Sequence, residues 1–448
     1  MNAKRDNFAS SFGILVALAG SAIGLGNLWR FPYLVGTNGG AAFIIVYLIF
    51  VFLLCLPILI SEFIVGRKSQ ANAFRAFKII KPKGHWGFIG IIAVIAAISI
   101  LSFYSVVGGW TIDYLVKALS FKLNVTGDTS NVIFNSMITS SWEPLLYMIL
   151  FLVITGAIIL GGIQNGIEKF SKVMMPLLFV MIILIAIRSV TLEGSVEGIK
   201  FLFRPDFSKL TGETILEALG QAFFSLSIGC GTIMTYASYV KKSENIIKTT
   251  SLTAISDTIF ALIASLAIMP AVFAFGKSPA QGPGLAFIII PEIFAQIPLG
   301  SILVIIFFFI LLIAALTSSI SLLEVAVTFI KEEFHIGRKV ATTISLLVCV
   351  VLGSLSSLSQ GVLADIKIFG MNIFDTFDYL SANILMPIGG LLLVIFVGWI
   401  MKKQDVINEM SNNGSLHFKN GLYSFIYGII RYVAPFVILA IMIFGFLS

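Results

Sequence analysis

The first long apolar stretch of the chain is interrupted by glycines, by an amide and by a charged side chain. Residues 20–40 read GSAIGLGNLWRFPYLVGTNGG. Glycine costs roughly 1 kcal/mol per position in a helix relative to alanine, and an arginine deep in a membrane span costs at least about 3 kcal/mol. A close contact between two helices explains the glycines but not Asn27 or Arg30. The segment therefore favours a membrane helix that is broken near the bilayer midplane, with freed backbone groups facing a cavity.

Composition places the whole chain in the membrane. Of its 448 residues, 58% are hydrophobic and 11% are charged, and the mean hydropathy is +1.03. These values exclude a soluble globular protein. A bilayer core needs about 20 apolar residues per helix. We predict eleven spans, in a single domain over 1–448, at residues 10–35, 41–66, 88–119, 143–162, 167–189, 214–240, 249–276, 299–330, 339–357, 379–401 and 424–447.

Lysines and arginines gather in alternate loops between the predicted spans. Arg67, Lys68, Lys241 and Lys242 lie on one side, whereas the opposite loops hold few cations, such as Lys122. Cytoplasmic loops carry such an excess of positive charge. We therefore expect the N-terminus inside the cell and, after an odd number of spans, the C-terminus outside. The net charge of +7 follows from this topology and does not indicate nucleic acid as a partner.

A second interrupted span lies half a protein later. Residues 220–239 read GQAFFSLSIGCGTIMTYASY, with Gly229 and Gly231 inside the predicted sixth span. Interrupted spans at corresponding positions indicate two inverted repeats of a transporter, with the binding site at their interface. We predict a first repeat over 10–189 and a second over 214–401, followed by a last helix at 424–447.

Oxygen donors accompany both interruptions. The predicted seventh span contains Asp257, and the eighth contains the run from Thr317 to Ser319. Serine and threonine most often bond back to their own helix, but consecutive hydroxyls on one turn can also point together into a site. Carboxylate, amide, hydroxyl and carbonyl oxygens suit a hard cation, and the spans offer no imidazole ligands. Sodium is the cation that we expect.

Four motifs carry a resemblance to a known family. They are AGSAIGLGNLWRFPYLVGTNGGAAF, QAFFSLSIGCG, TYASYV and ALTSSISLLE, in this order. With them the chain resembles the neurotransmitter:sodium symporters, which include the leucine transporter and the serotonin, dopamine and GABA transporters. Its eleven spans resemble the bacterial branch of tyrosine and multi-hydrophobic amino-acid transporters, whereas the leucine transporter has twelve. The resemblance implies an all-α integral membrane protein of the bacterial inner membrane. It also implies the leucine-transporter fold, an inverted five-plus-five repeat with broken helices 1 and 6.

The resemblance also implies two sodium sites and a substrate pocket. The first sodium site would comprise Ala22, Asn27, Ser225, Asp257 and the carboxylate of the substrate. The second would comprise Gly20, Ile23, Ala314, Thr317 and Ser318. The substrate pocket would comprise Ala22, Gly24, Gly26, Ile100, Tyr104, Phe224, Ser225, Ser227, Cys230 and Leu322. In this pocket Tyr104 would bond the substrate carboxylate and Phe224 would form a lid.

Gates and a hinge complete the implied machinery. Arg30 and Asp378, or alternatively Asp375, match the outer ion pair. Arg5 and Glu332 match the cytoplasmic pair, and Tyr239 matches the tyrosine that braces it. The spacing of Gly166 and Pro176 resembles a motif of local unwinding, although a proline kink alone also explains it.

These features together predict a sodium-coupled importer of a hydrophobic or aromatic L-amino acid, with tyrosine as first choice. Monoamine transporters of the family carry an aspartate in place of Gly24, so we expect a ligand that brings its own carboxylate. Asp257 predicts independence of chloride. A membrane receptor that senses an amino acid is the alternative, but it would not need gates at both ends. An enzyme would need a nucleophile with a base or a metal cluster, and the spans contain neither.

Overall fold

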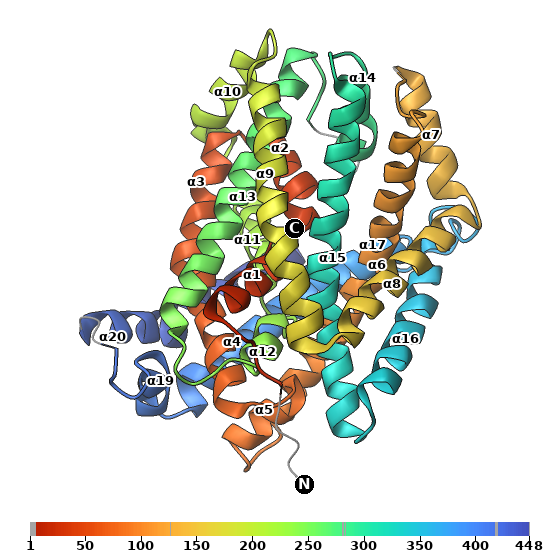
Figure 1. Cartoon of the computed structure of the whole chain (residues 1–448). Helices are drawn as coiled ribbons and strands as arrows, with labels where there is room; N and C mark the ends of the chain where they lie inside the picture. The colour runs from red at the N-terminus through yellow and green to blue at the C-terminus, as the bar shows by residue number, and fades with distance from the viewer. Residues whose placement is uncertain (1–5, 126, 280–281, 283, 417–419, 448) are drawn as a thin grey trace.

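The computed structural model describes residues 6–125, 127–279, 282, 284–416 and 420–447. These residues are helical almost throughout, with isolated bridges between Gly40 and Pro205 and between Ile368 and Met371. Figure 1 shows the long helices packed side by side, with the N-terminus at the same end of the molecule as α5 and α19.

Within the described residues, nine helices are long and apolar enough to cross a membrane, or ten when the bent first pair is taken as one span. The first predicted span corresponds to α1 (Ser11–Ala22), η1 (Gly26–Arg30) and α2 (Phe31–Thr37), and the second to α3 (Ala41–Ile49), η2 (Phe50–Cys55) and α4 (Leu56–Ser69). The third corresponds to α6 (Gly87–Leu119), the fourth to α8 (Glu143–Leu160), and the fifth to η3 (Ile163–Glu168) with α9 (Lys169–Val190). The next four correspond to α11 (Gly212–Ser225) with α12 (Thr232–Ala237), α13 (Ile246–Ala274), α15 (Gly300–Glu333) and α16 (Arg338–Leu358). The tenth corresponds to α17 (Ile373–Tyr379), η6 (Leu380–Leu385), α18 (Met386–Ile395) and η7 (Phe396–Ile400). The eleventh corresponds to α20 (Asn420–Gly428), η8 (Ile429–Val433) and α21 (Ala434–Leu447).

Shorter helices fill the loops between the spans. They are α5 (Ala73–Ile80), α7 (Asp128–Thr139), α10 (Ser195–Phe203), η4 (Phe207–Lys209), η5 (Leu285–Ile289), α14 (Ile290–Ala295) and α19 (Lys403–Met410). Composition alone had not marked these segments as helical, because each is shorter than a span; η5 with α14 is apolar, and the others are polar or mixed.

The first span is broken where the sequence predicted. α1 ends at Ala22, Ile23 is extended, and the two halves meet at an angle of 55°. Side chains satisfy the N–H groups that the break releases. The Gly24 N–H donates to Asn27 Oδ1 at 3.1 Å, and the Leu25 N–H donates to the Tyr104 hydroxyl at 3.1 Å. The break is therefore an ordered, hydrogen-bonded segment.

The sixth span is also interrupted. α11 ends at Ser225 and α12 begins at Thr232, and between them Gly229 and Gly231 adopt left-handed backbone angles that glycine favours. Glu62 of α4 holds this segment by accepting hydrogen bonds from the Gly229 N–H at 2.6 Å and the Met234 N–H at 3.3 Å. Neither α11 nor α12 is long enough to span alone, so the count of eleven spans stays a prediction that the structure allows.

Two spans differ in detail from expectation. The tenth begins at Ile373 rather than 379, because the Asn372 side chain accepts a hydrogen bond from the Asp375 N–H at 2.8 Å and caps the helix. The fifth is helical from Ile163 to Val190, with Pro176 inside α9. Unwinding between Gly166 and Pro176 is therefore absent from this structure, and it stays a prediction for another state.

Candidate substrate and sodium site

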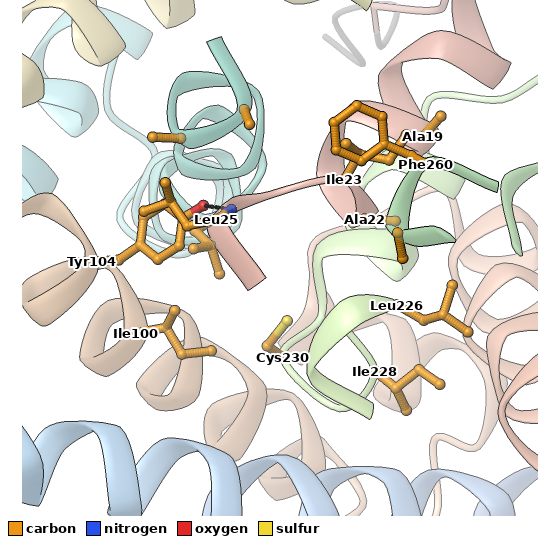
Figure 2. Close-up of a cluster of buried hydrophobic side chains, with 14 of the residues drawn as sticks. Ala19, Ala22, Ile23, Leu25, Ile100, Tyr104, Leu226, Ile228, Cys230 and Phe260 are labelled. Carbon is orange, nitrogen blue, oxygen red and sulfur yellow. Dashed lines mark hydrogen bonds between the residues drawn. The ribbon is translucent and has the colours of Figure 1, made fainter. Parts of the chain in front are cut away.

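A small cavity of about 30 Å³ lies between the two broken spans, α6 and α15. All of the predicted pocket residues line it, together with Ser21, Asn27, Ser318 and Met386. Figure 2 shows Ile100 and Tyr104 on one helix and Cys230 on the facing segment, arranged around the extended backbone near Leu25. The sequence had not pointed to Met386, because a methionine in an apolar span looks like ordinary packing.

Tyr104 and Gly24 fit together closely at one end of this cavity. The Tyr104 hydroxyl accepts the Leu25 N–H, and the phenol is 4% exposed. A Cβ atom at Gly24 would lie 2.6 Å from the Ser318 hydroxyl oxygen and 2.9 Å from the Tyr104 hydroxyl oxygen. Any side chain at this position must therefore displace one of these two groups.

The Asn27, Ser225 and Asp257 side chains of the first predicted sodium site are in direct contact. Asn27 Nδ2 donates to Asp257 Oδ1 at 2.8 Å and to the Ser225 hydroxyl at 3.2 Å. The Ser225 hydroxyl donates to Asp257 Oδ2 at 2.7 Å, and the Tyr47 hydroxyl approaches the same oxygen at 3.3 Å. All four side chains are buried. The cluster supplies a carboxylate with neutral oxygens, which is a donor set that suits a hard monovalent cation.

The second predicted sodium site joins the end of α1 to α15. The Ser318 hydroxyl lies 3.4 Å from each of the carbonyl oxygens of Gly20 and Ile23. The Thr317 hydroxyl donates to the Ala314 carbonyl at 3.0 Å. Carbonyls at a helix end lack partners within the helix, so the Gly20 and Ile23 oxygens are available to a cation beside the Ser318 hydroxyl, whereas the Thr317 hydroxyl is bonded to its own helix. No group of three or more His, Cys, Asp or Glu side chains suited to a metal occurs among the described residues.

A phenyl ring separates the small cavity from a wider one on the predicted outer side. Gly26, Tyr104 and Phe224 line both cavities, and the outer one has a volume of about 220 Å³. The Arg30 guanidinium carbon lies 5.0 Å from the centre of the Phe224 ring. Phe224 thus occupies the position expected of a lid.

The predicted outer ion pair is not formed in this structure. Arg30, Asp375 and Asp378 all line the wider cavity. No ion pair joins Arg30 to either aspartate among the residues that the structure describes. Closure of Arg30 over a ligand stays a prediction.

On the predicted cytoplasmic side, Arg5 lies outside the described residues. Glu332 accepts hydrogen bonds from the backbone and side-chain nitrogens of Asn72 at 2.9 and 3.0 Å. The Tyr239 hydroxyl donates to Glu324 Oε1 at 2.8 Å. The role of Tyr239 in bracing the Arg5–Glu332 pair stays a prediction, and the structure shows Tyr239 bonded to a different carboxylate, about two helical turns from Glu332 along α15.

Glu324 belongs to a buried network that the sequence analysis had missed. Arg338 donates to its two carboxylate oxygens at 3.0 and 2.6 Å, and Glu324 itself is 0% exposed. The Thr328 hydroxyl lies 3.0 Å from the Tyr239 hydroxyl. Glu324 and Thr328 lie on α15, Arg338 lies on α16, and Tyr239 follows α12. The contacts of the Tyr239 hydroxyl with Glu324 and Thr328 therefore join the sixth span to the paired helices α15 and α16.

Glu168 anchors the residues that precede α1. Its carboxylate accepts the Ala9 N–H at 2.7 Å and the Ser10 hydroxyl at 3.0 Å, and Lys172 pairs with it at 2.6 Å. The Phe8 N–H donates to the Tyr239 carbonyl at 3.2 Å. These bonds fasten the segment before α1 to α9 and to the end of the sixth span. Nothing in the spacing of the sequence distinguished Glu168 from an ordinary charge at a helix end.

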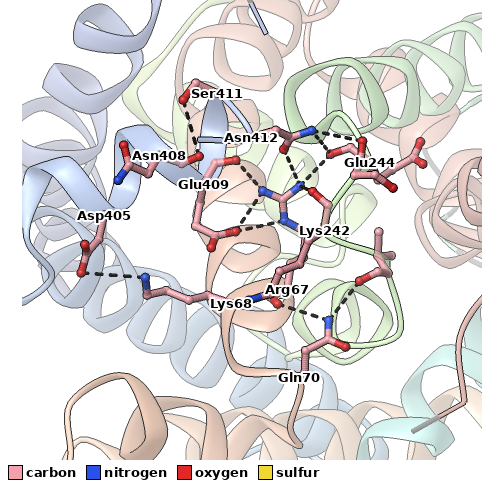
Figure 3. A network of polar contacts seen from close by, with 12 residues as sticks. Arg67, Lys68, Gln70, Lys242, Glu244, Asp405, Asn408, Glu409, Ser411 and Asn412 are labelled. Atoms are coloured by element: carbon pink, nitrogen blue, oxygen red, sulfur yellow. Dashed lines mark hydrogen bonds and ion pairs between the residues drawn. The ribbon is translucent and has the colours of Figure 1, made fainter. Parts of the chain in front are cut away.

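A further polar network fixes α19 against the end of α4 (Figure 3). Arg67, which is 1% exposed, bonds Glu409 of α19 at 2.9 Å and the Glu244 carbonyl at 2.6 Å. The Asn412 side-chain oxygen accepts a further bond from Arg67 at 2.8 Å. The end of α4, the loop before α13 and α19 therefore form one fastened unit.

Helices long and apolar enough to cross a membrane, with two interrupted spans around a central cavity, indicate a membrane transporter. Comparison with known proteins gives the family. The chain matches the Sodium:neurotransmitter symporter family over residues 5–142 and 132–448. It therefore belongs to this family, and it is a sodium-dependent multi-pass membrane transporter rather than an enzyme.

Relatives and a solved structure agree with this assignment. The uncharacterised sodium-dependent transporter YhdH of Bacillus subtilis is 41% identical over 439 residues, 98% of this chain and 97% of the relative. An uncharacterised sodium-dependent transporter of Haemophilus influenzae is 37% identical over 454 residues, 99% of this chain and 98% of the relative. The crystal structure of MhsT in complex with L-phenylalanine is 40% identical with a TM-score of 0.92, and the match covers 98% of this chain and 99% of that chain. The predicted family and fold class are confirmed.

Proposed function

We propose that the protein imports a hydrophobic or aromatic L-amino acid together with sodium, and that tyrosine is its preferred substrate. The observation that carries this proposal is the cavity at the two helix breaks, whose lining contains all ten predicted pocket residues. It lies directly beside the Asn27–Asp257 cluster and the Ser318 carbonyl contacts. The substrate and two sodium ions would therefore be neighbours.

In this proposal the substrate is an α-amino acid and so carries a carboxylate in its head group. The space at Gly24 is filled by the Tyr104 and Ser318 hydroxyls, so the protein offers no acid there to neutralise an amine. A substrate carboxylate would accept a hydrogen bond from Tyr104 and complete the first sodium site with Asn27. Decarboxylated amines lack this group and should not bind.

The side chain of the substrate would lie near Cys230. In the leucine transporter a phenylalanine occupies the matching position, and a thiol leaves more room. The L-phenylalanine in the related MhsT crystal structure supports a large apolar side chain. Ile100, Leu322 and Met386 also line this cavity, and together they would make its wall mainly apolar.

Transport would proceed by alternating access through two gates. Arg30 with Asp378, or with Asp375, would close the outer side over Phe224. Arg5 with Glu332 would close the cytoplasmic side. The first repeat, residues 10–189, and the second, residues 214–401, would supply corresponding halves of the pathway, with Gly166 and Pro176 as a hinge. The protein would lie in a bacterial inner membrane with its N-terminus inside and its C-terminus outside.

Uptake into proteoliposomes tests this proposal. Labelled tyrosine should accumulate only when an inward sodium gradient is present, and all twenty amino acids and tyramine should be tested as competitors. Tryptophan, phenylalanine and leucine should compete, and tyramine should not. Binding of tyrosine without sodium-driven accumulation would instead support an amino-acid receptor. Competition by tyramine as strong as that by tyrosine would refute the assignment of the head group.

A further inference from the structure

An arginine without an acidic partner lies on the last span. Arg431 belongs to η8, and no carboxylate lies within 4.0 Å of its guanidinium among the residues that the structure describes. Its Nε atom is buried without a hydrogen-bond partner. Its Nη1 atom donates to the Tyr427 hydroxyl at 3.3 Å, and this hydroxyl is neutral and does not balance the positive charge. An uncompensated arginine on a membrane helix is unfavourable unless an anion meets its charge.

Aromatic rings position this guanidinium. Its central carbon lies 4.6 Å from the centre of the Trp399 ring and 5.4 Å from that of Tyr432. The Trp399 indole N–H donates to the Arg431 carbonyl at 2.9 Å, which fixes the indole against η8. A planar guanidinium held against aromatic faces can form a paired contact with an oxyanion through the Nη1 and Nη2 N–H groups that Tyr427 leaves unbonded.

The surroundings of Arg431 are basic and face the lipid. Trp399 is the second-to-last residue of η7, and its side chain bonds the Arg431 backbone. Arg431 therefore lies level with the end of the tenth span. Lys402 and Lys403 follow η7 after Met401 and are exposed, and the Lys403 Nζ atom lies 5.7 Å from the centre of the Tyr427 ring. Tryptophan, tyrosine and lysine are typical of the level of the lipid headgroups.

The acids of the adjoining helix α19 are already paired. Asp405 lies 3.8 Å from Lys68, and Glu409 bonds Arg67 at 2.9 Å. They do not neutralise Arg431. The remaining charge on this surface is therefore positive among the described side chains.

An apolar strip continues from the basic group along the last span. Trp399 is 54% exposed, Tyr432 61% and Phe436 73%. Tyr432 and Phe436 lie about one helical turn apart and so share a face. A headgroup held at Arg431 would place an acyl chain along these rings.

We propose that this surface binds an anionic phospholipid of the cytoplasmic leaflet. Arg431 forms a paired contact with the lipid phosphate, Lys402 and Lys403 attract its negative charge, and an acyl chain packs along Tyr432 and Phe436. The assignment to the cytoplasmic leaflet follows from the proposed orientation of the chain, whereas the binding of lipid does not depend on it.

Native mass spectrometry of the purified protein tests the proposal. Phosphatidylglycerol and phosphatidylcholine are titrated onto the wild type, Arg431→Gln and the control Arg188→Gln. Arg188 is also a half-buried arginine without an ion pair in the described structure. It lies in the last turn of α9, which the proposed orientation places on the opposite side of the membrane from Arg431. Wild type and the control should prefer phosphatidylglycerol. Arg431→Gln should bind it about five-fold more weakly, since one cation near an anionic surface contributes roughly 1 kcal/mol.

Several outcomes would overturn the proposal. They are equal affinity of the wild type for the two lipids, unchanged binding in Arg431→Gln, and equal weakening in the control. Glycerol phosphate that binds as tightly as the lipid would indicate a site for a free phosphate. A change in oligomeric state without a change in lipid binding would indicate a protein interface. If Arg431→Gln does not fold, Lys402→Gln/Lys403→Gln provides the same comparison, and unchanged lipid preference in it would also count against the proposal.

Discussion

Tyr239→Phe removes a single hydroxyl group from the predicted cytoplasmic side. That hydroxyl donates to Glu324 at 2.8 Å and lies 3.0 Å from the Thr328 hydroxyl. Glu324 keeps both bonds to Arg338 in the variant, so no buried charge is left unpaired. The largest single loss is then the hydrogen bond to the charged Glu324, about 1.5–3 kcal/mol.

This energy sets the size of the expected shift. Tyr239 lies beyond α12 on the sixth span, whereas Glu324 lies on α15. If opening of the cytoplasmic side separates them, the variant loses stabilisation only in the closed state. The open population should then rise by roughly 10- to 150-fold, as long as the closed state remains in excess.

The native cysteines report this shift. Cys230 lines the central cavity and is 1% exposed, whereas Cys55 and Cys349 are 0% exposed. A membrane-impermeant maleimide is applied to the cytoplasmic face of inside-out vesicles, and the rate of Cys230 labelling is measured. Tyr239→Phe should label about 10-fold faster or more, from the lower end of the hydrogen-bond energy. A Cys230→Ser variant defines the background.

Tyr114→Phe is the matched control for this experiment. The Tyr114 hydroxyl is buried and has no hydrogen-bond partner in the described structure, so its removal should leave the labelling rate unchanged. Equal rates in the wild type and Tyr239→Phe would refute the reasoning, because the hydroxyl would then stabilise the open and closed states alike.

Four further predictions concern the pocket, the ions and the gate. Cys230→Phe should move substrate preference toward smaller side chains, and an unaltered apparent affinity for tyrosine would contradict this. Gly24→Ala should abolish uptake because its Cβ would lie 2.6 Å from a hydroxyl oxygen, whereas Gly220→Ala, with nothing within 4 Å of its Cβ, should retain uptake. Wild-type uptake should persist when gluconate replaces chloride, since the carboxylate of Asp257 supplies the negative charge; Asp257→Asn should lower uptake, and added chloride should partly restore it. Glu332→Gln should increase cytoplasmic labelling of Cys230, and an unchanged rate would indicate a charge that does not act as a gate.

Sequence alone predicted the features that depend on local composition. Long apolar runs located the spans, and glycines with polar neighbours located both breaks, which lie at Ile23 and around Gly229 in the structure. Both features follow from the cost of polar and flexible residues in a membrane helix. The resemblance to the family then supplied the residues of the pocket, and all of them line one cavity.

Partners between helices were not predictable in the same way. Glu324 and Arg338 are separated by a helix end and a turn, and only the packing of α15 against α16 brings them together. Glu168 binds Ala9 from a distant part of the sequence. An isolated charge in the sequence does not indicate which of several neighbouring helices will supply its counter-charge. The early start of the tenth span was missed because Asp375 and Asp378 lower its local hydropathy.

The short segment from Ile23 to Gly26 has a consequence for how ligands influence one another. In the proposed sites its carbonyls and neighbouring groups would contact the substrate and both ions. Fixing one backbone residue costs about 1–2 kcal/mol of conformational entropy, so in a state that releases the hydrogen bonds of Gly24 and Leu25 the first ligand that reorders this segment leaves less disorder for the next to remove. This cooperativity would add to that from the direct contact proposed between the substrate carboxylate and the first ion, and it would extend to the second ion. Thermodynamic linkage requires reciprocity: the factor by which sodium tightens amino-acid binding must equal the factor by which the amino acid tightens sodium binding.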